Sequence, residues 1–243
     1  MRTLRDIFYV NGNTKLGEYL FYGMTFQEFL SAIPRPIENL LLLRENYEAV
    51  TRLIQIFGVI EGSRNVQEYA QTELYFDGPF CFVDYFNPES ANLITPQEAS
   101  ELLYLSYVQK PLHSPFFEHL QNQYVYLGED DGWRCRLFCC EQNDFGRILA
   151  NKVQNEVQRR FEYPCEKLDE QVECSLFKLV DDGLIIDFSA ISCLDNDISI
   201  PVYTVGKFED MDYVYHNREK LKARAAYEGW LEYSKQKWRL FDL

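Results

Sequence analysis

The side chains best suited to chemistry gather between residues 107 and 140. Two of the chain's three histidines lie there, and an adjacent pair of cysteines ends the segment. The candidate site residues are Tyr107, His113, His119, Asp130, Asp131, Trp133, Cys139 and Cys140. A cysteine becomes a nucleophile when a histidine within hydrogen-bond reach takes its proton. One hypothesis is therefore an enzyme or a small-ligand binder whose site lies in residues 107–140.

The same segment also has a purely structural interpretation. Cys139 and Cys140 fall on a predicted strand, where neighbouring side chains point to opposite faces, so one of the two is buried. No local signature of a cysteine protease surrounds them. Asp130 and Asp131 fall at the tip of a predicted hairpin, where paired carboxylates are solvated turn residues. We therefore expect the cysteines to be buried thiols and name no catalytic residue.

Motifs for metals, phosphates and acyl transfer are missing from the sequence. His113 and His119 lack the spacing of helical ligands, and neither His-Glu-x-x-His nor Cys-x-x-Cys occurs, so we expect no metal. Neither the Gly-x-Gly-x-x-Gly nor the Gly-x4-Gly-Lys-Ser/Thr pattern is present, and Gly-x-Ser-x-Gly is absent as well. We expect no cofactor, and the absence of these motifs favours a protein that is not an enzyme.

Charge is distributed unevenly along the chain. Residues 71–213 carry 10 Lys/Arg and 26 Asp/Glu, whereas residues 214–243 carry 7 and 4, and the whole chain has a net charge of −14. Nucleic-acid binding draws on Lys and Arg at phosphates, so this balance argues against nucleic acid as a partner. An acidic surface suits a basic protein partner instead.

Composition bears on the cellular compartment and on solubility. The seven cysteines are odd in number, which does not suit a disulfide framework. No segment approaches the roughly 18 uninterrupted apolar residues of a membrane span. The apolar run at residues 7–10 is shorter than the core of a signal peptide, about 7–15 residues. We expect a cytoplasmic protein that does not enter membranes.

Local patterns place the elements that would position these residues. Thr25-Phe-Gln-Glu28 and Thr95-Pro-Gln-Glu98 are capping boxes that predict helix starts. Asp-Asp-Gly turns predict two β-hairpins, one of residues 123–127 and 133–140 and one of residues 172–180 and 184–188. Apolar periodicity predicts helices over 143–161 and, as the last element, 219–238.

These patterns favour an α+β fold, with a helical N-terminal part and a larger part of antiparallel β-hairpins and packed helices. The polar stretch 61–71 predicts a mainly helical subdomain over 1–62 and a main domain over 72–243, unless the two form one continuous domain. The leading functional hypothesis is a non-enzymatic interaction or regulatory protein that binds a basic protein through its acidic surface. The alternatives are the enzyme or ligand binder above and a structural homo-oligomer subunit.

Overall fold

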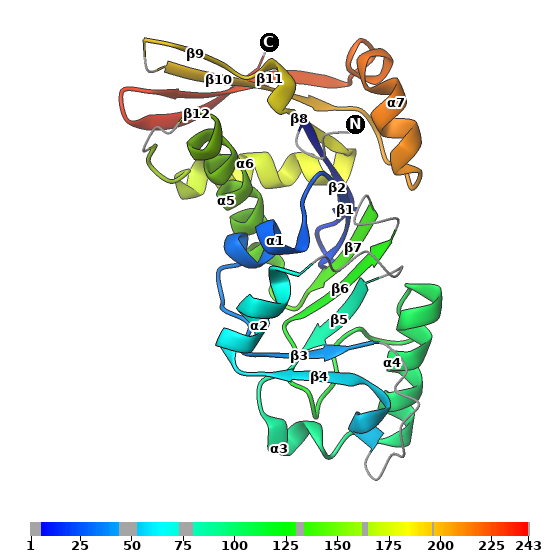
Figure 1. Ribbon diagram of the computed structural model, residues 1–243. Helices are drawn as coiled ribbons and strands as arrows, with labels where there is room; N and C mark the ends of the chain where they lie inside the picture. Colours follow the sequence, from blue (N-terminus) through cyan, green and yellow to red (C-terminus); the bar gives the residue numbers. More distant parts are fainter. Residues whose placement is uncertain are drawn as a thin grey trace. The chain divides into compact units, whose positions relative to one another are not determined.

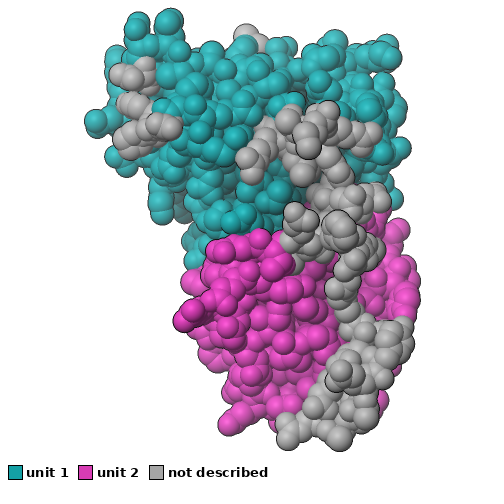
Figure 2. Space-filling view, viewed as in Figure 1, with its two compact units in different colours: residues 1–34, 142–243 teal, residues 35–141 magenta. Residues whose placement is uncertain are grey.

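The structure is a computed structural model that describes residues 6–43, 53–72, 80–129, 134–161, 165–195 and 197–242. The chain forms two compact units, coloured separately in Figure 2. Unit 1 combines Met1–Pro34 with Gln142–Leu243, and unit 2 is the continuous segment Arg35–Glu141. These boundaries differ from the predicted segments 1–62 and 72–243, whose independent folding stays a prediction.

Unit 1 contains a sheet with the strand order β12-β11-β10-β8-β1-β2, and β9 pairs with β10 (Figure 1). All its described pairings are antiparallel. Its strands are β1 (Ile7–Asn13), β2 (Glu18–Tyr22), β8 (Leu184–Asp187), β9 (Ser192–Leu194), β10 (Asp197–Thr204), β11 (Tyr227–Ser234) and β12 (Lys237–Asp242). Its α-helices are α1 (Phe26–Ala32), α5 (Gln142–Phe161), α6 (Glu170–Lys178) and α7 (Met211–Lys222), with 3-10 helices η3 (Leu179–Asp182) and η4 (Phe188–Ala190).

Helix α5 joins the N-terminal and C-terminal segments of unit 1. It packs on α1 and α6. The ring of Phe145 on α5 stacks on Tyr19 of β2, with centroids 3.9 Å apart. The amide of Asn151 donates to the carbonyl of Ala32, at the end of α1, over 2.7 Å. The apolar face predicted for residues 143–161 is therefore confirmed as a packing surface.

Unit 2 has the strand order β7-β6-β5-β3-β4, again with antiparallel neighbours. Its strands are β3 (Asn39–Leu42), β4 (Gly58–Glu61), β5 (Phe80–Asp84), β6 (Tyr124–Glu129) and β7 (Arg134–Cys139). Its helices are η1 (Leu53–Ile56), α2 (Ser63–Ala70), α3 (Pro88–Ala91) and α4 (Pro96–Val108).

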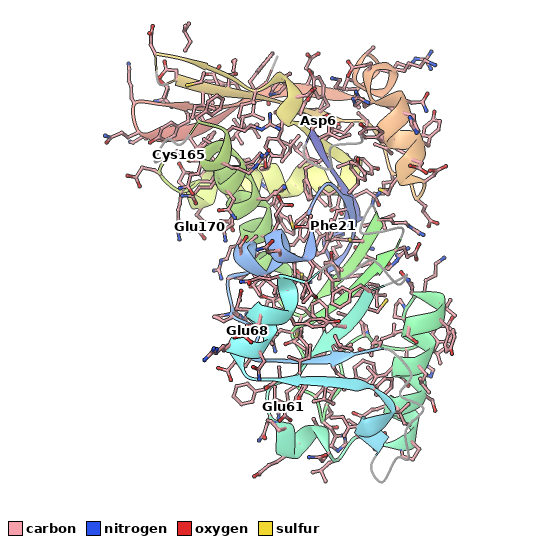
Figure 3. All side chains as sticks on the ribbon, viewed as in Figure 1. Asp6, Phe21, Glu61, Glu68, Cys165 and Glu170 are labelled. Atoms are coloured by element: carbon pink, nitrogen blue, oxygen red, sulfur yellow. The ribbon has the colours of Figure 1, made fainter. Side chains whose placement is uncertain are left out.

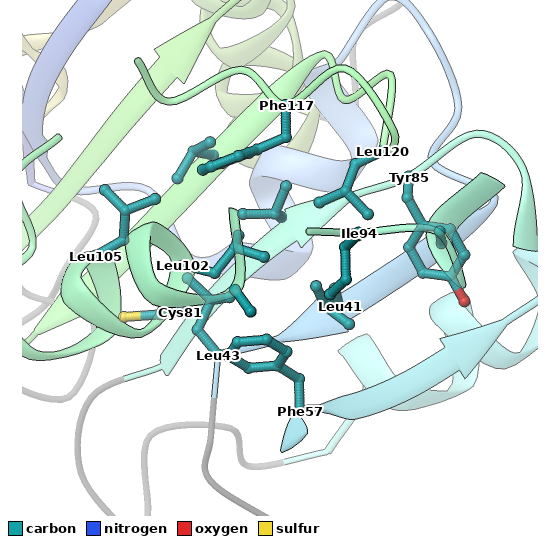
Figure 4. Packing of buried hydrophobic residues seen from close by; sticks show 14 of the residues in the cluster. Leu41, Leu43, Phe57, Cys81, Tyr85, Ile94, Leu102, Leu105, Phe117 and Leu120 are labelled. Atoms are coloured by element: carbon teal, nitrogen blue, oxygen red, sulfur yellow. The ribbon is translucent and has the colours of Figure 1, made fainter. Parts of the chain in front are cut away.

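The core of unit 2 lies between this sheet and α4 (Figure 4). Helix α4 contributes Leu102 and Leu105, three residues apart on one face, and these pack with strand residues such as Leu41. The segment after α4 adds Phe117 and Leu120 to the same cluster. Burial of so many large side chains supplies the main favourable term in folding this unit.

The fold is mixed α+β with antiparallel sheet, as the sequence predicted. The helical N-terminal part is not confirmed, because residues 7–13, 18–22, 39–42 and 58–61 are strands. Both capping boxes start helices: Thr25 caps α1 and Thr95 caps α4. The first Asp-Asp-Gly hairpin is confirmed as β6 and β7, although its tip at residues 130–133 lies outside the described residues.

The second predicted hairpin is wrong, because residues 172–180 are not a strand. They form most of α6 and the start of η3. The buried residues Val172, Leu176 and Val180 are four apart, which is helical spacing. Asp169 caps α6 by accepting from the backbone N–H of Val172. Gly183, with φ of 75°, ends η3 instead of closing a hairpin.

The predicted final helix over 219–238 is also wrong. Helix α7 ends at Lys222, and β11 and β12 follow it as a hairpin. The buried residues Gly229, Leu231 and Tyr233 alternate with more exposed ones, which is the period of a strand and not of a helix. Among the described residues, no helix combines the length and the apolar character needed to span a bilayer.

Candidate functional site

Two of the three histidines lie against the same helix of unit 2. The carboxylate of Glu98 accepts from the backbone N–H of Thr95 in the capping box. It also contacts His119, whose Nδ1 lies 2.8 Å from Oε2 and 3.0 Å from Oε1. Burial alone would raise the pKa of Glu98, but the hydrogen bonds from Thr95 and His119 hold it below its ordinary value. This carboxylate is therefore ionised when it meets the imidazole.

The segment that follows α4 runs back along the helix. Nε2 of His113 lies 3.9 Å from Oε1 of Glu101, and His119 reaches Glu98, nearer the start of the helix. The amide of Asn122 is also engaged, accepting from the backbone N–H of Phe117 over 2.7 Å. The loop is thus held at several points, and it keeps both imidazoles beside acidic side chains.

Cys139 lies away from these histidines. It is on β7 opposite Tyr124 and is 1% exposed. Its neighbour Phe138 packs in the α4-facing core, and alternate strand residues face opposite ways. Cys139 therefore points to the other face of the sheet. Cys140 is exposed just beyond the strand.

The remaining predicted residues are either exposed or outside the description. Tyr107, near the end of α4, is 70% exposed. Asp130, Asp131 and Trp133 lie outside the described residues. The structure thus brings His113 and His119 to one helix, leaves Tyr107 further along it, and places Cys139 on the opposite face of the sheet.

A hollow of about 400 Å³ in unit 2 contains a residue that sequence reasoning missed. Its lining includes Arg35, Glu38, Asp84, Phe86, Gln121 and Gln123. Asp84 ends β5 and is buried, and its Oδ1 accepts from the backbone N–H groups of Gln123 and Tyr124 over 3.0 and 2.6 Å. Burial raises the pKa of Asp84 to about 7, although those backbone hydrogen bonds oppose the rise.

The walls of this hollow are fixed by hydrogen bonds. The buried amide of Asn39 donates to the carbonyls of Tyr85 and Phe86 over 3.1 and 3.3 Å. Tyr85 donates its hydroxyl to Glu61, labelled in Figure 3, over 3.2 Å. Nη1 of Arg35 donates to the side-chain oxygen of Gln123 over 2.9 Å. A buried carboxylate with a raised pKa in a preformed hollow is typical of a binding site.

Exposed apolar side chains gather along the same part of the sequence. Among the described residues, the large exposed apolar side chains between positions 86 and 112 are Phe86, Leu93, Tyr107, Val108 and Leu112. Residues 84–121 carry five acidic residues and one Lys. Elsewhere in unit 2, Arg64 and Arg134 are already paired with Glu68 and Glu129.

No group of three metal-ligating side chains comes together in the part of the chain that the structure describes. No known family, curated protein or solved structure shows significant similarity to this chain. Function is therefore inferred from the residues and geometry of the chain itself.

Proposed function

We propose that this chain is a non-enzymatic binding protein that engages a basic protein partner through an acidic and apolar surface of unit 2. The α4 surface, as we name it, consists of the exposed side chains Tyr107, Val108 and Leu112 and of Glu101, whose side chain is 12% exposed, with the single cation Lys110 between them. The exposed Glu118 follows in the same segment. The observation that carries the proposal is the exposure of Tyr107 and Leu112, 70% and 52%, in a segment with almost no cations.

Each component has a separate role in binding. Tyrosine and leucine bury apolar area at a contact, and tyrosine is among the residues enriched at the centre of interfaces. Carboxylates in the same segment would attract a cationic partner and repel nucleic acid. Such charges affect the choice of partner and the association rate more than the affinity. Nε2 of His113 lies 3.9 Å from Glu101, so one imidazole borders this surface.

The test is capture of partners from a cell extract at increasing salt, with the intact chain as bait. We expect captured proteins to be basic and to be released as salt rises from about 50 to 500 mM, because screening shortens the reach of charge. Double substitution Tyr107→Ala and Leu112→Ser should abolish capture. Leu194→Ser is the matched control, since Leu194 is 76% exposed in unit 1.

Capture that resists salt, or that survives Y107A/L112S but not L194S, would contradict the proposal. Sedimentation over a range of concentrations separates it from the alternative of a homo-oligomer subunit. A chain that self-associates and loses this association in Y107A/L112S would support the subunit hypothesis instead.

A second candidate function is binding of a small cation in the hollow beside Asp84. The buried carboxylate favours it, because a cation close to Asp84 would offset the cost of burying its charge. The probes are butylguanidine and butylamine, scored by the shift in thermal midpoint at pH 8. A shift in the wild type that is absent in Asp84→Asn supports this function. An equal shift in both proteins refutes it.

A further inference from the structure

Unit 1 contains a second hollow, of about 380 Å³, between α6 and β12. Asp169, Val172 and Ser175 form its helical side, and the consecutive residues 237–241 form the other side. Side chains of a strand alternate between its two faces. Five consecutive residues can line one hollow only where the edge of the strand faces it, so the hollow runs along the backbone edge of β12.

The β11–β12 turn shows which backbone groups lie on that edge. Lys235 and Gln236, the two turn residues, both have positive φ, 52° and 62°. A two-residue turn of this kind closes on a hydrogen-bonded pair, here Ser234 and Lys237. Such pairs alternate along an antiparallel ladder. Lys237, Arg239 and Phe241 therefore bond to β11, and the N–H and C=O groups of 238, 240 and 242 point away from it.

No described strand pairs with β12 on this outer side. The strand is nevertheless held firmly. Trp238 is buried, and its Nε1 donates to the carbonyl of Glu166 over 2.8 Å. On the facing side, α6 begins at Glu170, labelled in Figure 3, directly after its capping residue Asp169. The edge and the helix beside it are thus preformed, which lowers the entropy cost of binding.

Charge selects the kind of strand that could pair there. Lys235, Lys237 and Arg239 are all exposed on or next to β12. The last thirty residues carry an excess of three positive charges in a chain whose net charge is −14. Exposed cations on a sheet edge discourage pairing with apolar or basic strands. They favour a strand that carries carboxylates.

We propose that the outer edge of β12, with α6 beside it, binds an extended segment of a partner protein that carries carboxylate side chains. The segment pairs with β12 as an added strand, so its main chain bonds to the outward groups of 238, 240 and 242. Its carboxylates meet Lys237 and Arg239. This surface shares no residue with the α4 surface, so the two proposals stand or fall separately.

The probe is the labelled peptide acetyl-Glu-Val-Glu-Val-Glu-Val-amide, titrated with the intact chain and followed by fluorescence anisotropy. We expect a dissociation constant below about 1 mM. The lysine analogue, and a version with every second amide N-methylated, should each bind at least about tenfold more weakly, because they lose charge attraction or strand pairing. No binding of the glutamate peptide at 1 mM, or equal binding of the N-methylated one, would overturn the proposal.

Two variants test the location. Lys237→Glu with Arg239→Glu should weaken binding at least about tenfold. The same charge change at Lys220 and Arg224, outside the lining of the hollow, should leave binding unchanged. Leu240→Pro removes one outward N–H, a change that edge strands tolerate, and should also weaken binding; circular dichroism verifies its fold. If K237E/R239E leaves the affinity for the peptide unchanged, the proposed location is wrong.

The oligomeric state distinguishes a partner protein from a second copy of the chain. If the wild type forms a dimer that dissociates in L240P, a second copy occupies the edge.

Discussion

Asp84 illustrates how one side chain can be both structural and responsive. Its carboxylate fixes the start of β6 by accepting from the N–H groups of Gln123 and Tyr124. Burial nevertheless raises its pKa to about 7, from an ordinary value of 3.8. The folded chain therefore binds this proton more tightly than the unfolded chain does. Protonation of Asp84 therefore stabilises the folded chain at low pH, and this stabilisation is lost as pH rises from about 4 to 7.

Asp84→Asn should remove this pH dependence. The side-chain oxygen of Asn can still accept from both backbone groups, but it carries no charge to desolvate. The wild type loses this contribution between pH 5 and 8 and the variant does not. The free energy of unfolding of the variant, measured relative to that of the wild type, should therefore rise by on the order of 2 kcal/mol from pH 5 to pH 8. Urea unfolding across this range measures the difference. Parallel pH profiles for the two proteins would contradict the prediction, as would carboxyl titration of Asp84 near pH 4 by NMR.

A second residue, Glu156 on α5, holds a buried ionic cluster in unit 1. Lys152 lies 3.2 Å from Glu28 and 3.9 Å from Glu156, and Arg160 donates to Glu156 over 2.8 Å. Burial would raise the pKa of Glu156, but the hydrogen bonds from Arg159 and Arg160 and the charge of Lys152 lower it below 4.5. Its stabilising effect is therefore complete above pH 4.5 and is lost as pH falls through its lowered pKa.

Glu156→Gln should destabilise the chain by about 3 kcal/mol at pH 7, because the buried Lys152 loses one of its carboxylate partners and Arg159 and Arg160 lose the carboxylate that they share. Arg64→Ala is the contrasting control. The Arg64–Glu68 pair is an i, i+4 contact whose side chains are 90% and 59% exposed. Such pairs contribute less than about 0.5 kcal/mol. Chemical denaturation of the wild type and the two variants measures both effects. A similar loss of unfolding free energy in the two variants would show that burial does not determine how much an ion pair stabilises the fold.

At the scale of elements, the capping boxes predict the helix starts correctly. Apolar periodicity in short segments does not distinguish a helix from a strand. Both capping boxes were found because their bonds link residues three apart, within one turn of helix. The errors at 172–180 and 219–238 occurred where apolar residues fit both helical and strand spacing. Which residues of α6 are buried depends on contacts with parts of the chain that are distant in sequence, so local spacing alone does not reveal the helix. The signal for β11 was its alternation, Tyr227-Glu-Gly-Trp-Leu-Glu-Tyr233.

The candidate site shows the same limit. Residue types alone drew attention to His113 and His119, but their carboxylate partners are 12 and 21 positions away in the sequence. Asp84 could not have been selected, because the backbone groups that bind it, those of Gln123 and Tyr124, are 39 and 40 positions away in the sequence. The single available signal was an acidic residue at the end of the apolar run Phe-Cys-Phe-Val.

The β11–β12 turn leads to a prediction of its own. Lys235 and Gln236 adopt positive φ, which costs free energy in residues other than Gly, Asn and Asp. Replacing them with Asn and Gly, the residues this turn prefers, should stabilise unit 1 by about 1 kcal/mol. Thermal unfolding measures the gain. The reversed order, Lys235→Gly with Gln236→Asn, is the matched control and should stabilise less. A lower midpoint for K235N/Q236G would contradict the turn assignment.

At the scale of the whole molecule, the two units differ in continuity. Unit 2 is one uninterrupted segment with its own core, whereas unit 1 needs both ends of the chain. In unit 1, β1 lies between β8 and β2, and its residues from Ile7 to Val10 are buried. Strand β1 is therefore part of the core of unit 1.

Two shortened chains test this difference. Residues 35–141 alone should unfold cooperatively, because a continuous segment of this size with its own core meets the requirements of a domain. A chain that lacks residues 1–34 should retain protected amides in β5 and β6 but lose them in β8 and β10, since β1 no longer pairs with β8. Hydrogen exchange measures both. Protection of β8 in the shortened chain, or non-cooperative melting of 35–141, would contradict the assignment.

The discontinuity of unit 1 also has a consequence during synthesis. The strands β1 and β2 leave the ribosome before β8, the partner of β1, which follows only after unit 2 has been translated. At roughly 5–20 residues per second, the 165 residues from the end of β2 to the end of β8 take about 8–33 s. Throughout this interval the nascent chain exposes the aromatic residues Phe8, Tyr9 and Phe21, which are buried in the finished protein. Chaperones that recognise such segments should therefore bind this protein most strongly while it is still attached to the ribosome.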